Sequence, residues 1–527
     1  MRVEDQADPV WHDSLIITLA YALSWGALLV NRGFYWDDWT LVGQSPAALL
    51  HQFSELGLPW VGYLQVALLA LPLPGLMGHV FAFCTYLLST LILHAVMRRI
   101  PGLSRMDALI AAVTFAVLPV NYARIALIDL VYGLSLLAFL AATWLLVRYV
   151  EDGRVSRRMA ALLLYACSFS TASMLVLYVA PIALAAFFLW RSGRLSVRSA
   201  FLHHADFIAL PVIFWLVKSA FFTPSGVYQG YNALTLRGLA MVPGSMVSIP
   251  YQVLFEPLSR AVNVAGLLGL VAGVVAAVWL LRRSRADEGD GFVSAPLLAL
   301  TGAAVLGLGV FAYLAVGRDP TIWDWSSRHQ LLVPLGAGLL AAAAVRGVRG
   351  AGRAGPAFGV AVGLLLGVSV VADARTLVAY QLDWFKQTAL IDAVRTIPEA
   401  RSARHIRIVD TATSFNALRR TYRFYEYNAL FSQALGDERR LAADDATDPS
   451  GGNLARFIDR PAYHMGQYVP SPVDLELRVS VGNGSPGVMT VLRLVALEAL
   501  GSSSFAPEVS RLIDVRATPV GGSTPVP

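Results

Sequence analysis

Long runs of apolar residues, separated by short polar or arginine-rich stretches, fill the first 372 positions of the chain and then stop. Each run holds roughly 17–24 residues, enough to cross about 30 Å of hydrocarbon as an α-helix. Because lipid offers the backbone no hydrogen-bond partners, a bundle of helices is the expected form. The pattern predicts about eleven membrane spans, near residues 14–30, 76–97, 106–120, 127–149, 158–172, 174–190, 204–222, 262–281, 293–316, 330–346 and 355–372. A shorter apolar segment closed by prolines, residues 59–74, is predicted to be a re-entrant or interfacial helix.

The loops between the spans differ in charge. If the N-terminus is cytoplasmic, the inward loops read "RRIPGLSR", "RYVEDGRVSRR", "RSGRLSVR", "RRSR" and "RGVRGAGR". The outward loops hold only isolated basic residues, which is the positive-inside pattern of membrane proteins. An odd number of spans then places the C-terminus outside, and the expected location is a bacterial inner (plasma) membrane.

The polarity pattern changes after residue 372. "HIRIVD", residues 405–410, alternates like a strand, and residues 422–436 are predicted to form a helix that ends at a glycine. "DLELRVSV" and "GVMTVLRLVAL" flank "GNGSP" and predict a hairpin. The sequence therefore predicts an all-α polytopic membrane bundle over residues 1–372, a small extracytoplasmic α/β domain over 373–516, and a disordered tail over 517–527.

Composition agrees with a membrane protein. Hydrophobic residues make up 56% of the 527 positions and charged residues only 14%, whereas a soluble domain carries about 25% charged residues. The net charge of +6 follows from the arginine-rich inward loops, so it gives no indication of a nucleic-acid partner.

Two adjacent acids, Asp37 and Asp38, lie between Trp36 and Trp39 in "NRGFYWDDWTLVG", residues 31–43. This loop follows the first span and is predicted to face outward. Successive side chains diverge on a helix or a strand, so we expect one carboxylate to enter a cleft and the other to bond backbone or a nearby cation. Acids and tryptophans are also ordinary at a membrane surface, so the pair alone does not establish a function.

An acidic pair directly after the first span resembles the hallmark of GT-C type integral-membrane glycosyltransferases, which take sugars from polyprenyl phosphate. "PWVGYLQVALLALPLPGLMGHVFAFCTYLLSTLILHAVMRRI", "FAVLPVNYARIALIDLVYGLSLLAFLAATWLLVRY" and "SRHQLLVPLGAGLL" are similar to later helices of that class. The resemblance implies a glycosyltransferase with Asp37 as general base and inversion at the anomeric carbon. It also implies that Asp38 orients the acceptor or a metal.

Such an enzyme needs cations for the phosphate of its donor, and an arginine fork can hold phosphate oxygens. Arg328, which follows "DPTIWDWSS", is the favoured candidate, and Arg124 in "PVNYAR" is the second. His329, next to Arg328, is also predicted to bind the substrate. A basic residue at this level is equally suited to binding a lipid headgroup.

Aromatic residues supply the predicted contacts to the sugar. Trp36 belongs to an aromatic collar suited to stacking on a sugar face. The long outward loop 223–261 is rich in Tyr, Gly and Pro, and it is predicted to cover the donor with Tyr228 or Tyr231 near the sugar. Two adjacent acids also suit a divalent cation such as Mg²⁺ or Mn²⁺, but members of the class differ in this need, so no cofactor is assigned.

The expected partners are therefore a polyprenyl-phosphate-linked sugar, an extracytoplasmic acceptor (glycan, lipid or protein) and membrane lipids. Two alternatives stay open. A flippase for lipid-linked glycans would need a charged central cavity, yet the spans carry almost no charge at their centres. A polymerase or ligase of surface polysaccharide would rely on arginine and histidine in a large outward loop, and here that loop holds only Arg237 and Arg260.

Overall fold

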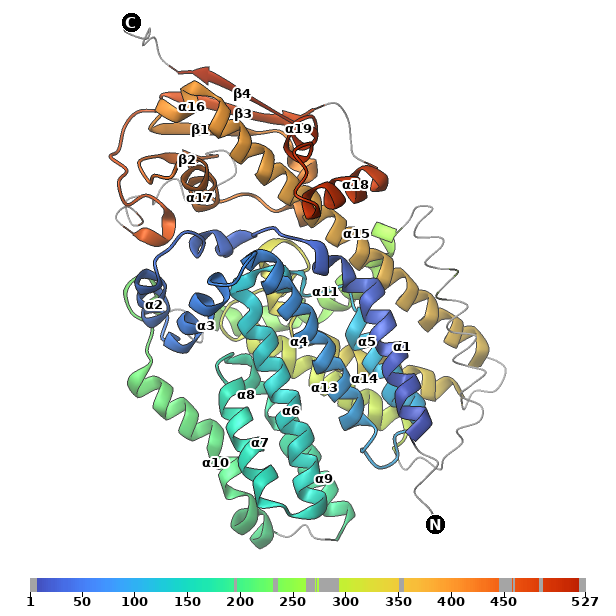
Figure 1. The fold of residues 1–527 in the computed structure, drawn as a ribbon. Coiled ribbons are helices and arrows are strands. Elements are labelled where there is room, and N and C mark those ends of the chain that lie inside the picture. Colours follow the sequence, from blue (N-terminus) through green and yellow to red (C-terminus); the bar gives the residue numbers. More distant parts are fainter. Residues whose placement is uncertain are drawn as a thin grey trace, which may run out of the picture.

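The computed structural model describes residues 7–193, 197–230, 236–261, 271, 273, 293–349, 355–444, 457, 460–482 and 487–520. It has two parts, a helical membrane module and a C-terminal domain that contains a small β-sheet (Figure 1). The helices of the membrane module are α1 (Ala7–Trp25), α2 (Pro46–Glu55), α3 (Pro59–Leu69), α4 (Pro74–Met97), α5 (Arg105–Val117), α6 (Leu130–Asp152), α7 (Val155–Ser168), α8 (Ser173–Leu177), α9 (Val179–Arg191), α10 (Val197–Phe221), α11 (Leu236–Ala261), α13 (Ala295–Leu314), α14 (Val333–Arg349) and α15 (Gly355–Thr396).

Seven stretches of helix in the described residues are long and apolar enough to cross a membrane. They are Trp11–Val30, Pro74–Met97, Leu127–Asp152, Ser173–Arg191, His204–Phe221, Ala295–Leu314 and Val360–Thr396. A bent pair, Asp324–Gln330 and Val333–Gly347, meets at 58° and would make an eighth span. The chain is thus a helical membrane protein.

The predicted count of eleven spans is not confirmed. Two of the predicted spans, 106–120 and 158–172, form helices α5 and α7 of only 13 and 14 residues, which reach about 20 Å. Helix α5 stops early because Leu118 precedes a proline and is therefore extended. The predicted span 262–281 lies outside the described residues apart from two positions.

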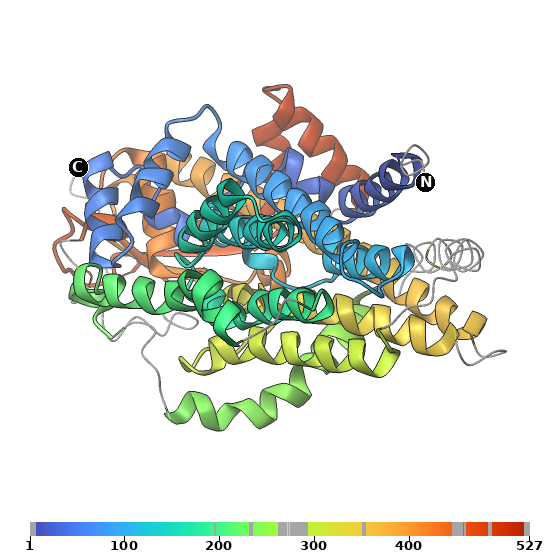
Figure 2. The ribbon, with the colours of Figure 1, turned by 90° about the horizontal axis from the view of Figure 1, so that it is seen from below.

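The short apolar segment after residue 59 forms helix α3, which is shorter than a membrane span; its re-entrant or interfacial position stays a prediction. It pairs with α2 at the end of the bundle nearest the C-terminal domain (Figure 1). Helix α11 lies along the outer edge of the bundle beside α13 (Figure 2). The loop after α1 lies under the C-terminal domain and contacts its helix α17 (Phe424–Leu435) through residues Trp36–Thr40.

The C-terminal domain is built on a four-stranded sheet of order β2-β1-β3-β4. Strand β1 (His405–Asp410) runs parallel to β2 (Leu441–Ala443) and to β3 (Leu475–Val481), and β4 (Ile513–Pro519) is antiparallel to β3. Its helices are α16 (Pro398–Ser402), α17 (Phe424–Leu435), α18 (Val488–Ala499) and α19 (Phe505–Ser510). Helix α15 runs unbroken from the bundle to this domain (Figure 1), so the predicted boundary at 372/373 lies inside one helix.

The predictions for this domain have mixed outcomes. Strand β1 is confirmed, and α17 ends at Gly436, whose φ of 76° suits a glycine. The predicted hairpin is wrong, because residues 488–499 form helix α18, which buries Val491 and Leu494 at helical spacing. Residues 517–519, predicted to belong to a disordered tail, are part of strand β4. Residues 521–527 lie outside the described part.

One apolar core joins the two parts of the molecule. It contains Phe34 and Trp39 of the first outward loop, Phe385 of α15, and Phe415 and Tyr427 of the C-terminal domain. Because buried apolar surface stabilises this junction, the domain is packed directly on the loop that carries the acidic pair.

Candidate active site

The loop that carries the acidic pair has a fixed and unusual backbone. Asp37 and Asp38 lie in a short 3₁₀ helix, Trp36–Thr40, that starts at Trp36 with a φ of 51°. A left-handed conformation is rare for a bulky residue. The indole of Trp36 is fixed in turn by a 2.6 Å hydrogen bond from Nε1 to Oδ1 of Asp324. The hydroxyl of Tyr35 lies 2.8 Å from the carbonyl of Tyr380 on α15.

Asp38 is fully buried, and its carboxylate oxygens accept hydrogen bonds from backbone amides. Its Oδ1 accepts a hydrogen bond from the amide of Ile128 at 2.9 Å, and its Oδ2 accepts one from the amide of Tyr35 at 3.1 Å. Burial raises the pKa of Asp38 to about 7, although these backbone amides oppose the shift. Asp38 therefore ties the first outward loop to the second, and the expectation that one acid bonds backbone is confirmed.

Asp37 points the other way and is only partly buried. Its Oδ1 accepts a 2.7 Å hydrogen bond from the hydroxyl of Tyr425, on α17 of the C-terminal domain. Tyr463 and Tyr228 also lie within electrostatic range of Asp37. Burial raises the pKa of Tyr425 well above its usual value, so this phenol stays a hydrogen-bond donor. The predicted site residue Tyr228 is thus brought close to Asp37, while Tyr231 lies outside the described residues.

Arg328 faces the same group of acids from the loop before α14. It is 9% exposed, and its guanidinium carbon lies 4.2 Å from the ring centroid of Trp325. Asp129 interacts electrostatically with Arg328 and with both acids of the pair. The neighbouring residue Ser327 accepts a hydrogen bond from the amide of Ala123 at 2.9 Å. Three loops, after α1, before α6 and before α14, therefore bring Asp37, Asp129 and Arg328 together.

The other two predicted residues have local partners. The guanidinium carbon of Arg124 lies 3.7 Å from the ring centroid of Trp25 and 4.3 Å from that of Tyr86. Its nitrogens donate to the carbonyls of Val120 and Asn121, both at 3.1 Å. Nδ1 of His329 lies 3.3 Å from the carbonyl of Asp319. These placements favour Arg328 over Arg124 as the cation closest to the acids.

Backbone strain is concentrated around this site. Seven non-glycine residues in the described part have a positive φ, and they lie in loops between the bundle helices or in the C-terminal domain: Trp36, Leu73, Asn121, Asp324, Leu418, Arg419 and His464. Nε2 of His464 lies 2.8 Å from the carbonyl of Trp39. Strained residues that the surroundings hold in place tend to occur at functional sites, so this clustering supports a site at the junction.

Sequence reasoning missed the residues that the C-terminal domain contributes. Besides Tyr425, Arg420 reaches the loop, with its guanidinium carbon 5.5 Å from the ring centroid of Trp36. Its Nε bonds Asp383 at 2.7 Å and its Nη1 bonds Glu426 at 2.6 Å. No local sequence motif marks Arg420 or Tyr425 as a site residue. The sequence predicted only that a C-terminal domain is present.

The acidic pair does not fit a divalent cation. Both oxygens of Asp38 are held by backbone amides, and the described residues contain no group of three or more His, Cys, Asp or Glu side chains placed to hold a metal. Hard cations take six or more oxygen ligands.

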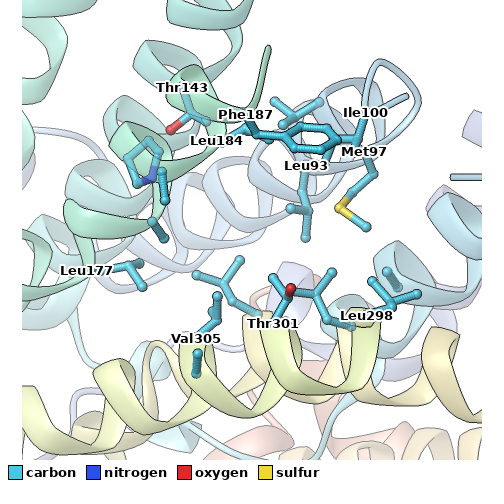
Figure 3. Close-up of a pocket in the computed structure, with 18 of the residues that line it drawn as sticks. Leu93, Met97, Ile100, Thr143, Leu177, Leu184, Phe187, Leu298, Thr301 and Val305 are labelled. Carbon is cyan, nitrogen blue, oxygen red and sulfur yellow. The ribbon is translucent and has the colours of Figure 1, made fainter. Parts of the chain in front are cut away.

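An apolar cavity of about 510 Å³ opens in the bundle below this site. Side chains from α4, α6, α9 and α13 point into it, and Figure 3 shows aliphatic groups almost throughout, with hydroxyls only from Thr143 and Thr301. Two of its lining residues, Phe139 and Leu335, lie ten and seven positions along the chain from Asp129 and Arg328.

Comparison with known proteins adds no further constraint. No protein-family model matches the chain, and no curated protein is significantly similar to it.

Proposed function

We propose that this protein is a GT-C type glycosyltransferase of the inner (plasma) membrane that moves one sugar from a polyprenyl-phosphate donor to an extracytoplasmic acceptor. The proposal includes a cytoplasmic N-terminus, about eleven spans in total, and a C-terminal domain on the outer side. One observation carries it: Asp37, partly exposed and bonded to Tyr425, lies at the junction of three outward loops with Asp129 and Arg328 nearby.

Asp37 is the candidate general base. As the acceptor oxygen forms its bond to the anomeric carbon, the bond from that carbon to the phosphate oxygen breaks. The electron pair leaves with polyprenyl phosphate, and the acceptor's proton passes to the carboxylate of Asp37. Attack from the face opposite the leaving group inverts the anomeric centre. A carboxylate placed in this way contributes typically 10²–10⁴-fold to the rate.

Arg328 and the apolar cavity fit the two ends of the donor. A guanidinium stacked on Trp325 keeps its planar fork for phosphate oxygens. The cavity is lined in part by α14, the helix that follows Arg328 after a bend of 58°, and it offers aliphatic walls to an isoprenoid tail. A flippase would need polar lining for its glycan along the whole path, and this cavity is lined by aliphatic and aromatic carbon.

The direct test is sugar transfer by the purified full chain. Asp37→Asn keeps the size of the side chain and an oxygen that accepts from Tyr425, but it removes the base. With polyprenyl-phosphate-linked mannose, galactose, glucose and arabinose as donors and an envelope extract as acceptor, the rate should fall at least about 100-fold. Asp514→Asn, on the surface strand β4, is the matched control and should keep the wild-type rate.

Two results would overturn parts of this proposal. Equal rates for Asp37→Asn and wild type would remove Asp37 as the base. Absence of transfer from every lipid-linked donor by the wild-type chain, together with no build-up of lipid-linked sugar in cells that lack the protein, would remove the enzyme class.

A further inference from the structure

A second cavity lies in the C-terminal domain, and it is small and polar. It has a volume of about 160 Å³ and is lined by Asp410, Thr413, Asn416, Arg419, Arg420, Thr421, Tyr422 and Asp444. Asp410 is the last residue of β1, and Asp444 follows the end of the parallel strand β2. Ligands of open α/β sheets bind outside the carboxyl ends of the parallel strands, which is where this cavity opens.

The floor of the cavity is a fixed polar network. Lys386 of α15 forms an ion pair with Asp410 and donates to Oδ1 of Asn416 at 2.6 Å. The hydroxyl of Tyr422 donates to Oδ1 of Asp383 at 2.7 Å. Because these groups already hold one another in place, a ligand would meet a preorganised surface and would lose less entropy on binding.

The rim is available for a ligand. Arg419 is exposed, and its backbone is left-handed with a φ of 56°. Its guanidinium carbon lies 4.6 Å from the ring centroid of Trp323, in the outward loop before α14. Thr413 and Thr421 also line the cavity. The lining thus combines hydrogen-bond donors and acceptors, and the stacking on Trp323 holds Arg419 against the membrane module.

We propose that this cavity binds one saccharide unit. That this unit belongs to the acceptor rests on the proposed function. Carboxylate, amide, guanidinium and hydroxyl groups all line it, and the neighbouring hydroxyls of a sugar ring can use both donors and acceptors of this kind. Its volume equals that of roughly five water molecules, which suits one ring and excludes a longer chain.

Charge favours a neutral polyol over an anion. Around the cavity, the cations Lys386, Arg419 and Arg420 face the carboxylates of Asp410, Asp444, Asp383 and Glu426. This balance gives no excess positive charge, which a phosphate or carboxylate ligand would need. Sugar hydroxyls carry no charge and can use both donors and acceptors.

The cavity is linked to the acid loop through Arg420. This residue lines the cavity, and its guanidinium lies over the rings of Tyr35 and Trp36, the two residues before Asp37. The cavity therefore lies on the side of the C-terminal domain that contacts the acid loop.

The test is direct binding by the full chain in detergent micelles, observed by saturation-transfer difference NMR with the methyl glycosides of mannose, galactose, glucose and arabinose. We expect signals from at least one glycoside. Arg419→Ala and Thr413→Val should each reduce the signal about fivefold or more, and the surface variant Arg493→Ala on α18 should leave it unchanged. Asp37→Asn should also bind normally, because the cavity lies apart from the base.

The possible results separate the saccharide site from the proposed enzyme activity. Absence of glycoside signals, or equal signals from wild type, Arg419→Ala and Thr413→Val, would overturn the saccharide site. Phosphate binding that depends on Arg419, seen by ³¹P NMR with no glycoside signal, would replace it with an anion site. Binding without transfer from any lipid-linked donor would keep the cavity and reject the enzyme. Transfer with an unaltered acceptor KM in both rim variants would keep the enzyme and reject the cavity.

Discussion

The hydroxyl of Tyr425 donates a hydrogen bond of 2.7 Å to Oδ1 of Asp37, across a separation of 388 positions in the chain. It connects a helix of the C-terminal domain to the loop after the first span. The domain is therefore part of the candidate active site, because the carboxylate of Asp37 accepts no other side-chain hydrogen bond among the described contacts.

Tyr425→Phe removes that hydrogen bond and keeps the ring. A hydrogen bond to a charged group contributes about 1.5–3 kcal/mol, so the carboxylate of Asp37 should lose part of its fixed orientation. We expect the transfer rate to fall on the order of tenfold, less than for Asp37→Asn. Steady-state kinetics of the two variants would check this order. A rate for Tyr425→Phe equal to that of wild type would show that the orientation of Asp37 does not depend on the domain.

The raised pKa of Asp38 should make the stability of the folded chain depend on pH. Its folded-state pKa of about 7 lies above the ordinary value of 3.8, so the folded chain keeps a proton that the unfolded chain loses. Raising the pH from about 4 to about 7 therefore favours unfolding, and the contribution of Asp38 levels off above the folded pKa. Asp38→Asn cannot titrate, so its Tm in detergent should fall less steeply over this window.

The same variant also loses one acceptor for a buried backbone amide, either that of Tyr35 or that of Ile128. It should be destabilised by about 1–3 kcal/mol at pH 5. Parallel Tm curves for wild type and variant between pH 4 and 7 would show that Asp38 is not the titrating group.

Arg328→Lys tests the proposed phosphate contact. Lysine keeps the charge but loses the planar fork and the stacking on Trp325. The KM for the polyprenyl-phosphate donor should rise about tenfold, with little change in the KM for acceptor. Arg99→Lys, at the opposite end of the bundle in an ion pair with Glu151, is the control. Unchanged donor KM in Arg328→Lys would remove Arg328 from the donor site.

Arg124→Lys should behave differently. The guanidinium lies between the rings of Trp25 and Tyr86 and bonds two carbonyls of its own turn. An ammonium cannot stack on both rings, so we expect a loss of about 1–3 kcal/mol in stability, seen as a lower Tm. A raised donor KM at unchanged Tm would instead place Arg124 in the donor site.

Sequence patterns predicted the parts of the fold that depend on local periodicity. Apolar runs located the membrane helices, and alternation located β1, because burial of one face requires those patterns. The failures have local causes as well. Helix α5 is too short for a span because Pro119 forces Leu118 into an extended conformation. The apolar residues of 488–499 recur at helical and not alternating spacing, so this segment is a helix and not a strand.

The candidate site was predictable only where neighbours in the sequence decide it. The divergence of Asp37 and Asp38 follows from their adjacency, and the structure confirms that Asp38 bonds backbone. Arg420 and Tyr425 reach the acid loop through the packing of a whole domain on α15. Such contacts depend on how the domain docks, and no spacing within the sequence encodes them.

Arg420 is the residue whose loss should separate the two parts. It is 1% exposed and lies between the carboxylates of Asp383 on α15 and Glu426 on α17. Arg420→Met fills a similar volume but leaves two buried carboxylates without their cation, which typically costs about 3–5 kcal/mol. We expect a lower Tm and faster proteolysis after α15. Adding Asp383→Asn and Glu426→Gln to Arg420→Met removes the unpaired charges and should recover part of the loss. If the triple variant is no more stable than Arg420→Met, the stacking of Arg420 on Trp36 and Tyr422, rather than its ion pairs, holds the domain in place.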